Sequence, residues 1–442
     1  MGRLSRAQSQ EHNRARVLAA AREEFAERGF RDAKIDGIAE RAELTRGAVY
    51  SNFSGKRALY FTVLADLAER GPEPPHQEPG LTPREALGAL ARAWLARLPL
   101  TTDEPRGPAR LGMDVMPEIL ADERLRLSFA QLMKLDAILL GLALEGLRPS
   151  APSGGGLVWM AEAALTTLHG ASLMAAAAPG FTEPFNIVSA CEHLTELDLG
   201  DRRFATPWNT RARPADEPWS PPEATDAVRG EPAPLAADGV VAILGLHRLE
   251  AVEEAVRAAP PGVAITVVVV TGGSDELAPL ARLAVADLCG CLRQAFPRPA
   301  WPRLRVVLDG SGAIAAAAGL PSAGEGTESA VRVEDGRIVL RADGRGACHR
   351  VASATVGTAG TVGTVGTVGT VGTVGTVGTV GTVGTVGTVG TAGTRTGGTT
   401  TGTATDAATG TDPDVTTGTG AVPPGRVASD GPLPPGRAGH RG

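Results

Sequence analysis

The sequence has few features of secreted, metal-binding or membrane-spanning proteins. It holds only four cysteines (Cys191, Cys289, Cys291 and Cys348), too few and too dispersed for a disulfide framework. No CxxC pair has a matching His or Cys partner, so a zinc site is not expected. The first twenty residues are charged, and no apolar run of about 18 residues occurs. We therefore expect a cytoplasmic protein with no membrane partner, no metal and no other cofactor.

Charge of one sign is not in large excess either. The formal net charge is -6 over 442 residues, so the chain as a whole is not a polycation that coats nucleic acid. Residues 1–70, however, carry 13 Lys and Arg against 10 Asp and Glu, a net of +3. A modestly basic N-terminal segment thus stands in an acidic protein. The length and the 43 % hydrophobic content allow two or three domains.

Residues 10–70 predict four short helices. Apolar residues recur every four positions from Val17 to Phe25, which places them on one helix face. Gly29 is typical of a helix end. Thr45 is a candidate N-cap for the third helix, because its hydroxyl can accept a backbone N–H of the first turn.

Residues 34–60 fit a helix-turn-helix. The small Ala39 permits close approach of two helices, and Val49 anchors the second one. The outer face of that second helix is polar, with one aromatic residue and no large aliphatic one: Arg46, Gly47, Ala48, Tyr50, Ser51 and Asn52. Arg and Asn can pair with base edges in a major groove, while Tyr and Ser can reach phosphates. The alternative is an ordinary helix with a solvated polar face.

Two stretches carry a family resemblance. "VLAAAREEFAERGF" and "IDGIAERAELTRGAVYSNFSGKRALY" resemble the N-terminal DNA-binding domain of the TetR family of transcriptional regulators over about sixty residues. The resemblance implies a homodimer whose two recognition helices enter successive major grooves of a palindromic operator. It places the DNA-facing positions at Lys34, Thr45, Arg46, Gly47, Tyr50, Ser51, Asn52 and Lys56. Lys56 would lie over the DNA backbone as a point charge.

The resemblance also implies a ligand-responsive regulator. Residues 81–199 read as apolar helices and would form the domain that supplies the dimer interface and a ligand pocket. A small-molecule effector bound there would release a repressor from its operator. Candidate pocket residues are Trp94, Met113, Met116, Trp159 and His169. The alternative is that each of them belongs to the core or to the dimer interface.

Two positions depart from the family pattern. The family usually has a hydroxyl residue that caps the second helix, where this chain has Ala33 followed by Lys34. Loss of an N-cap costs about 1 kcal/mol, and Lys34 could restore a phosphate contact through its charge. The family favours glycine in the turn, where this chain has Glu43. In a left-handed conformation Glu43 would cost roughly 1 kcal/mol.

The sequence pattern changes after residue 200. Residues 201–238 are rich in Pro and lack periodicity, which predicts a linker. Residues 239–352 then alternate strand-like and helical stretches, and a "DG" turn joins the last two strands. The strands are expected at 239–246, 264–272, 303–310, 329–336 and 337–344. The expected fold class is therefore a multidomain chain with an all-α region followed by an α/β domain.

The phrase "VVLDGSGAIAAAAGL…AVRVEDGRIVLRADG" resembles the second half of thioredoxin-like proteins. Catalysis in such a domain would need a thiolate at a helix N-terminus. The loop after the strand at 264–272 holds no cysteine, and Cys289 and Cys291 come at the far end of the next helix. We therefore expect a degenerate thioredoxin-like domain without a CxxC motif and no enzyme activity. The alternative is a thiol-dependent redox enzyme or sensor.

Residues 353–442 form a low-complexity tail. Thr-Val-Gly and Thr-Ala-Gly triplets repeat from Thr355 to Gly393. A glycine at every third position disfavours strands and helices, and collagen would need a Pro-rich repeat. The tail has almost no large apolar side chains to offset the entropy of ordering, so disorder is expected.

Overall fold

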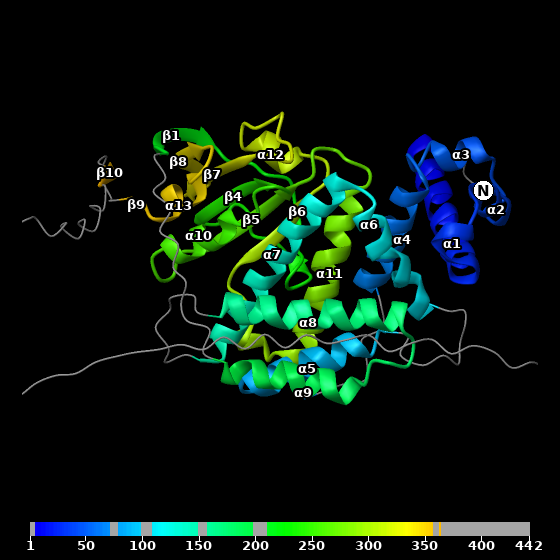
Figure 1. The fold of residues 1–442 in the computed structure, drawn as a ribbon. Helices are drawn as coiled ribbons and strands as arrows, with labels where there is room; N and C mark the ends of the chain where they lie inside the picture. Colours follow the sequence, from blue (N-terminus) through cyan, green and yellow to red (C-terminus); the bar gives the residue numbers. More distant parts are fainter. Residues whose placement is uncertain are drawn as a thin grey trace, which may run out of the picture. The chain divides into compact units, whose positions relative to one another are not determined.

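The computed structural model describes residues 5–70, 78–98, 108–148, 157–197, 210–356 and 362–363. Four helices lie at the N-terminus, in agreement with the sequence pattern: α1 (Arg6–Asp32), α2 (Ile35–Arg41), α3 (Arg46–Tyr50) and α4 (Lys56–Arg70). Gly29 leaves the helical conformation with φ 74° and ψ 170°, and α1 kinks there before a final turn. The predicted helix end is thus a kink within one element (Figure 1).

The next region is helical as well. It consists of α5 (Pro83–Leu95), η1 (Pro108–Asp114), α6 (Val115–Leu120), α7 (Glu123–Gly146), α8 (Val158–Ala177), α9 (Pro184–His193) and η2 (Leu194–Glu196). Thr82 and Glu85 form a capping box at the start of α5, and the Asp122 carboxylate caps α7. α5 packs on α9, and α7 packs on α8.

Among the described helices, only α7 is long and apolar enough to cross a membrane. Its most apolar window has a mean hydropathy of 1.6, and 61 % of that window is buried inside the protein. A core helix of a water-soluble domain has the same properties, so α7 is weak evidence for a membrane span.

The C-terminal region is a mixed six-stranded sheet in the order β1-β8-β7-β4-β5-β6. Its strands are β1 (Arg213–Pro218), β4 (Gly239–Gly245), β5 (Ile265–Val270), β6 (Arg305–Asp309), β7 (Glu328–Glu334) and β8 (Arg337–Asp343). β4, β5 and β6 are parallel, whereas β7 runs antiparallel to β4 and β8, and β1 antiparallel to β8. The five predicted strands are confirmed. Asp335 and Gly336 both have positive φ, as a type I′ hairpin turn requires.

The helices of this region are α10 (Ala251–Ala258), α11 (Leu277–Ala295), η3 (Arg298–Ala300), α12 (Ala313–Ala317) and α13 (Ala347–Ala352). Two short ribbons, β2 (Thr225–Asp226) with β3 (Glu231–Pro232) and β9 (Thr355–Val356) with β10 (Val362–Gly363), complete the described elements. The tail expected to be disordered lies outside the described residues, apart from 353–356 and 362–363.

The prediction of a structureless linker is wrong for residues 210–238. This segment contains β1, β2 and β3, and β1 forms one edge of the main sheet. Pro214 and Pro218 are tolerated because an edge strand has one free side. β1 is mostly exposed, so it shows no apolar alternation that the sequence could reveal. Trp219 follows it, is 4 % exposed and donates its indole N–H to the Leu235 carbonyl at 2.8 Å.

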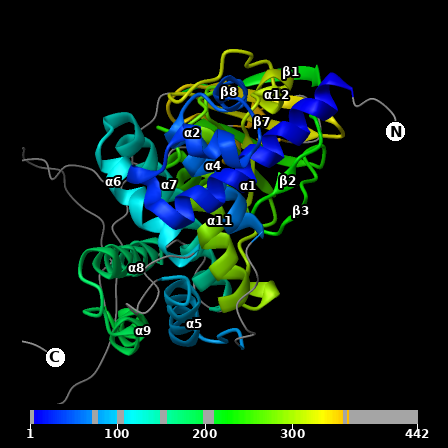
Figure 2. The same ribbon diagram turned by 90° about the vertical axis from the view of Figure 1, so that its right-hand side faces the viewer.

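The helix α11 joins the helical and α/β regions into one hydrophobic core. α11 packs against α4, α5 and α7, and Figure 2 shows it beside α4 and α7. The core on this side of the sheet runs without interruption from α1 to α13 and includes Ala242, Val267 and Val306. A second, smaller core covers the opposite face of the sheet around Ile243 and Val268.

Candidate nucleic-acid interface

The turn between α2 and α3 is held by backbone bonds and one side-chain cap. The Leu44 N–H donates to the Ala39 carbonyl at 2.9 Å. The Thr45 hydroxyl accepts the Ala48 N–H at 3.2 Å, which confirms the predicted N-cap. Ala39 and Val49 are buried at the contact between the helices. The local sequence therefore forms the expected helix-turn-helix.

Glu43 occupies the left-handed region of the turn, with φ 48°. A residue with a Cβ is disfavoured there by about 1 kcal/mol or more, which is why glycine would suit the position. The Glu43 carboxylate is exposed and accepts a hydrogen bond from the Arg16 guanidinium at 2.8 Å. The cost considered for a left-handed Glu43 therefore applies to this chain, and the Arg16 charge offsets that of the Glu43 carboxylate.

A buried carboxylate compensates for the missing hydroxyl cap of α2. The N-cap residue is Lys34, whose side chain makes no capping bond. Glu24 of α1 is 2 % exposed, accepts the Lys34 N–H at 3.4 Å and pairs with Arg41 Nε at 3.0 Å. Arg41 also pairs with Glu27, and this bond is the first cause of its raised pKa. The ion pairs fix α2 against α1, and sequence spacing gives no sign of them.

Most of the predicted outer face of α3 is exposed, whereas Ala48 and Asn52 are half-buried. Thr45, Arg46, Gly47, Tyr50 and Ser51 are exposed, and so is Lys34 at the start of α2. The Arg46 guanidinium lies 5.5 Å from the centroid of the Tyr50 ring. Its pKa is raised, first by a hydrogen bond with Tyr50 and then by the charge of Asp36. Arg46 therefore remains a cation and is held by weak, exposed contacts that a stronger partner can replace.

Three predicted DNA-facing residues bond within the protein. The Ser51 hydroxyl and the Asn52 amide both donate to the Ala48 carbonyl, at 2.9 and 2.8 Å. Lys56 Nζ donates to the carbonyls of Phe30, Arg31 and Ala33, at 2.7, 3.2 and 3.1 Å. The Lys56 ammonium thus satisfies carbonyls at the C-terminal end of α1, a role that the sequence does not indicate.

Gly47 has no structural reason to be glycine. Its φ is not positive, and an added Cβ would meet only the Thr45 hydroxyl oxygen, at 3.8 Å. Glycine in a helix costs about 0.5–1 kcal/mol relative to alanine. The space above Gly47 is open, so the absence of a side chain leaves the α3 backbone accessible to a large partner.

The helix-turn-helix is attached to the rest of the chain mainly through α4. Arg57 pairs with Asp122 at 2.9 Å and with Glu276 at 2.7 Å. Arg282 of α11 pairs with Asp66 at 2.9 Å and with Glu69 at 2.6 Å. The partners in these pairs are up to 219 positions apart, so sequence reasoning missed them.

A second attachment involves η1. The Asp114 carboxylate accepts the Phe30 N–H at 2.9 Å, beside the kink at Gly29. The Tyr60 hydroxyl donates to the Leu111 carbonyl. Burial raises the pKa of Tyr60, so the phenol stays protonated and remains a donor. α1 and α4 are therefore both bonded to η1.

The predicted ligand residues are spread through the helical core. Trp94 is 9 % exposed, donates to the Ser172 hydroxyl at 2.9 Å and contacts the edge of the His169 ring. Met113, Met116 and Trp159 are half-buried. The structure thus brings Trp94 and His169 together. None of them lines the cleft that lies between α11 and the end of β6.

Burial lowers the pKa of His169 to about 4. Its folded pKa is below the unfolded value of about 6.5, so protonation favours the unfolded chain. The stabilising effect is complete above pH 6.5 and is lost as the pH falls toward 4. The pKa of Asp287 is raised to about 6, which opposes this loss, so the effect of His169 is measured as a difference between variants. Between pH 7 and pH 4.5 the free energy of unfolding of the wild type should fall by about 2–3 kcal/mol more than that of His169→Leu. His193→Leu, at an exposed site, should follow the wild type, and equal slopes in the wild type and His169→Leu would contradict the assignment.

The thiols do not form a reactive site. Cys191, Cys289, Cys291 and Cys348 are all free and buried. Burial raises the pKa of Cys191 and of Cys291 to about 12, and it raises the pKa values of Cys289 and Cys348 as well. A nucleophilic thiol needs an accessible thiolate, which none of the four provides. Within the described residues, no group of three or more His, Cys, Asp or Glu side chains could hold a metal ion.

The helix-turn-helix matches known proteins. Residues 17–63 match the bacterial regulatory proteins of the tetR family. The HTH-type transcriptional regulator SrpR of Pseudomonas putida is 45 % identical over 65 residues, 15 % of this chain and 30 % of that protein. The HTH-type transcriptional activator FasR of Mycolicibacterium smegmatis is 41 % identical over 54 residues, 12 % of this chain and 25 % of that protein. The N-terminal part of this chain is therefore a helix-turn-helix of the tetR type.

The chain spans 30 % of the length of SrpR and 25 % of the length of FasR. A solved structure of a transcriptional regulator from Rhodococcus sp. Rha1 is 24 % identical, with 41 % of this chain and 94 % of that chain covered and a TM-score of 0.29.

Proposed function

We propose that the chain is a ligand-responsive transcriptional regulator that binds double-stranded DNA through α3. One observation carries the proposal: a tetR-type helix-turn-helix presents Arg46 and Tyr50 on an exposed face beside the open backbone of Gly47. In this proposal Arg46 pairs with base edges and Tyr50 reaches a phosphate. Thr45, Ser51 and Lys34 lie at the ends of this face and would contact the backbone.

Asn52 and Lys56 take smaller parts in this proposal. Both side chains already donate to carbonyls of the protein, so contact with DNA requires them to exchange partners. Lys56 has its three N–H groups directed at three carbonyls. Its contribution to DNA binding would come from its charge rather than from a direct bond.

We further propose a homodimer on a palindromic operator. An apolar patch on α8, on α9 and between them supports a second copy as the partner: Leu173, Met174, Phe181 and Phe185 are 48, 37, 74 and 75 % exposed. Exposed aromatic residues of this size are typical of a covered interface. A two-fold dimer would present two α3 helices to successive major grooves, about 34 Å or more apart.

The proposed mode of regulation is repression that a small-molecule effector relieves. Binding of the effector must change how α4 is held, because α4 connects the helix-turn-helix to η1 and to α11. A protein that acts on chromosomal DNA in this way would work in the cytoplasm. The four buried thiols weigh against the redox alternative, so the proposed function is not enzymatic.

Arg46→Ala and Tyr50→Ala test the proposal. Each should weaken binding to DNA selected from a random pool by about fivefold to a hundredfold, because one good side-chain contact contributes about 1–3 kcal/mol. The oligomeric state in sedimentation should not change. Arg303→Ala, at an exposed site next to β6, is the matched control. Unchanged affinity in both α3 variants would remove α3 as the recognition surface.

A further inference from the structure

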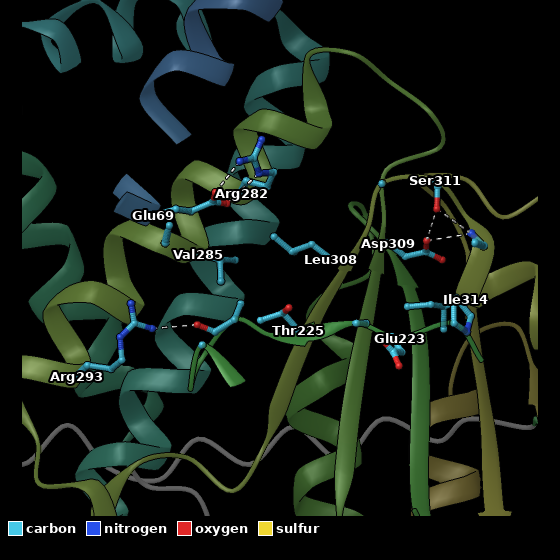
Figure 3. A pocket seen from close by; sticks show the side chains of 17 residues that line it. Glu69, Glu223, Thr225, Arg282, Val285, Arg293, Leu308, Asp309, Ser311 and Ile314 are labelled. Carbon is cyan, nitrogen blue, oxygen red and sulfur yellow. Dashed lines mark hydrogen bonds and ion pairs between the residues drawn. The ribbon is translucent and has the colours of Figure 1, made fainter. Parts of the chain in front are cut away.

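A cleft of about 600 Å³ lies between α11 and the end of β6. Val285 and Ala286 of α11 line one side, and Leu308 and Ile314 line the other. Figure 3 shows the Val285 and Leu308 side chains in the space between the two elements. The middle of the cleft is therefore apolar and large enough for a small organic molecule.

Two guanidinium groups of α11 line the same cleft, and only one of them is paired with carboxylates. Arg282 pairs with two carboxylates of α4, Asp66 and Glu69. Arg293 donates to the carbonyls of Ala227 and Val228, each at 3.1 Å. Within the described residues, no carboxylate forms an ion pair with Arg293. Carbonyl groups orient a guanidinium but leave its positive charge without a counterion.

Two of the three carboxylates that line the cleft, Asp309 and Glu69, have donors within the protein. Asp309 is 4 % exposed and accepts hydrogen bonds from the Ser311 hydroxyl and from the backbone N–H groups of Ala313 and Ala315. Glu69 accepts from Arg282, and Glu223 is exposed to solvent. A bound cation would have to compete for Asp309 and Glu69, which leaves it only the solvated carboxylate of Glu223 at the rim. An anion, in contrast, finds the Arg293 charge without a carboxylate partner among the described residues.

From these contacts we infer that the cleft is the effector site and that the effector is a carboxylate with an apolar body. The carboxylate pairs with Arg293 in the bidentate geometry that guanidinium groups favour. The apolar body lies along Ala286 and Leu308, the half-buried apolar side chains of the lining. This inference rests on the proposed function, since it names the class of effector that would bind to the regulator.

The cleft is connected directly to α4. Glu69 is the α4 residue that lines it, and the Arg282–Glu69 pair forms part of its wall (Figure 3). A ligand that fills the space beside Arg282 changes the surroundings of this pair. α4 directly follows α3 in the chain. A change in the position of α4 on ligand binding is therefore transmitted to α3.

Calorimetric titration of the full chain tests the ligand class with octanoate, octylamine and octanol, which share one body and differ in the head group. Octanoate should bind and octylamine should not. Arg293→Met should weaken octanoate binding at least about tenfold, and Arg303→Met should leave it unchanged.

Because loss of Arg293 can loosen the fold, Ala286→Phe provides a second variant that fills the cleft and should abolish octanoate binding. Absence of octanoate binding, equal binding of octylamine, or an unaffected Arg293→Met variant would overturn the inference.

The connection to α4 is tested with octanoate at saturation. The affinity of the wild-type chain for selected DNA should change when octanoate is added, and Arg282→Met should abolish that response. An identical response in Arg282→Met would overturn the route through α4. DNA binding without octanoate is measured in parallel: its absence would refute the proposed function, whereas the calorimetry decides the ligand site independently.

Discussion

Gly47→Ala is expected to weaken DNA binding by roughly tenfold to a hundredfold without harm to the fold. The added Cβ meets no atom of the protein closer than 3.8 Å, so the unbound chain accommodates it. Alanine is favoured over glycine in a helix, and the free energy of unfolding should rise by up to about 1 kcal/mol. Any loss of affinity therefore has to come from a clash between the added methyl group and DNA. Its free-energy cost should be similar to the contribution of one base contact.

Gly170→Ala is the matched control for this substitution. Gly170 lies in α8, is exposed, and an added Cβ would meet nothing within 4 Å. Both variants should unfold at slightly higher denaturant concentration than the wild type, and only Gly47→Ala should bind DNA more weakly. If Gly47→Ala bound DNA as tightly as Gly170→Ala, the α3 backbone would not approach the duplex.

Removal of residues 210–442 is expected to prevent the remaining chain from folding, although residues 1–209 contain every element of the helix-turn-helix and the helical region. α11 packs against α4, α5 and α7, and its loss exposes all three. A buried leucine contributes about 1.5–3 kcal/mol, and α11 buries five: Leu277, Leu280, Leu283, Leu288 and Leu292. Several such losses exceed a typical domain stability of about 5–15 kcal/mol.

The measurement for this truncation is thermal unfolding followed by circular dichroism. A chain of residues 1–209 should show no cooperative transition, whereas residues 1–356 should unfold like the full chain. The longer fragment lacks the repeat tail and keeps α11, so it controls for the effect of shortening the chain. A cooperative transition in residues 1–209 within a few degrees of the full chain would contradict a shared core.

Local patterns in the sequence predict local structure well. The helix-turn-helix, the Thr45 cap and five of the six strands of the main sheet follow from spacing, capping and turn chemistry within a few residues. Each of these features depends on neighbours in the chain. For the same reason, helical spacing alone is enough to predict which residues of α3 are exposed.

Long-range packing could not be predicted in the same way. The Arg57–Glu276 and Arg282–Asp66 contacts join residues more than 200 positions apart, and the Glu24–Arg41 pair has no sequence signature. One signal was present: α4 is buried without a break from Ala58 to Ala65, and a helix that is apolar on all faces needs partners on several sides. That pattern indicates a second partner besides α1, but not that α11 supplies it.

The most direct test of DNA reading by α3 is selection of DNA from a random pool by the full-length chain, followed by affinity measurements at increasing salt. We expect an inverted repeat whose half-sites are centred about one helical turn or more apart. We also expect the logarithm of the binding constant to fall by about 0.9 per phosphate neutralised for each unit of log salt. A pool without an enriched sequence, or binding that does not depend on salt, would contradict the assignment of α3 as a DNA-reading helix.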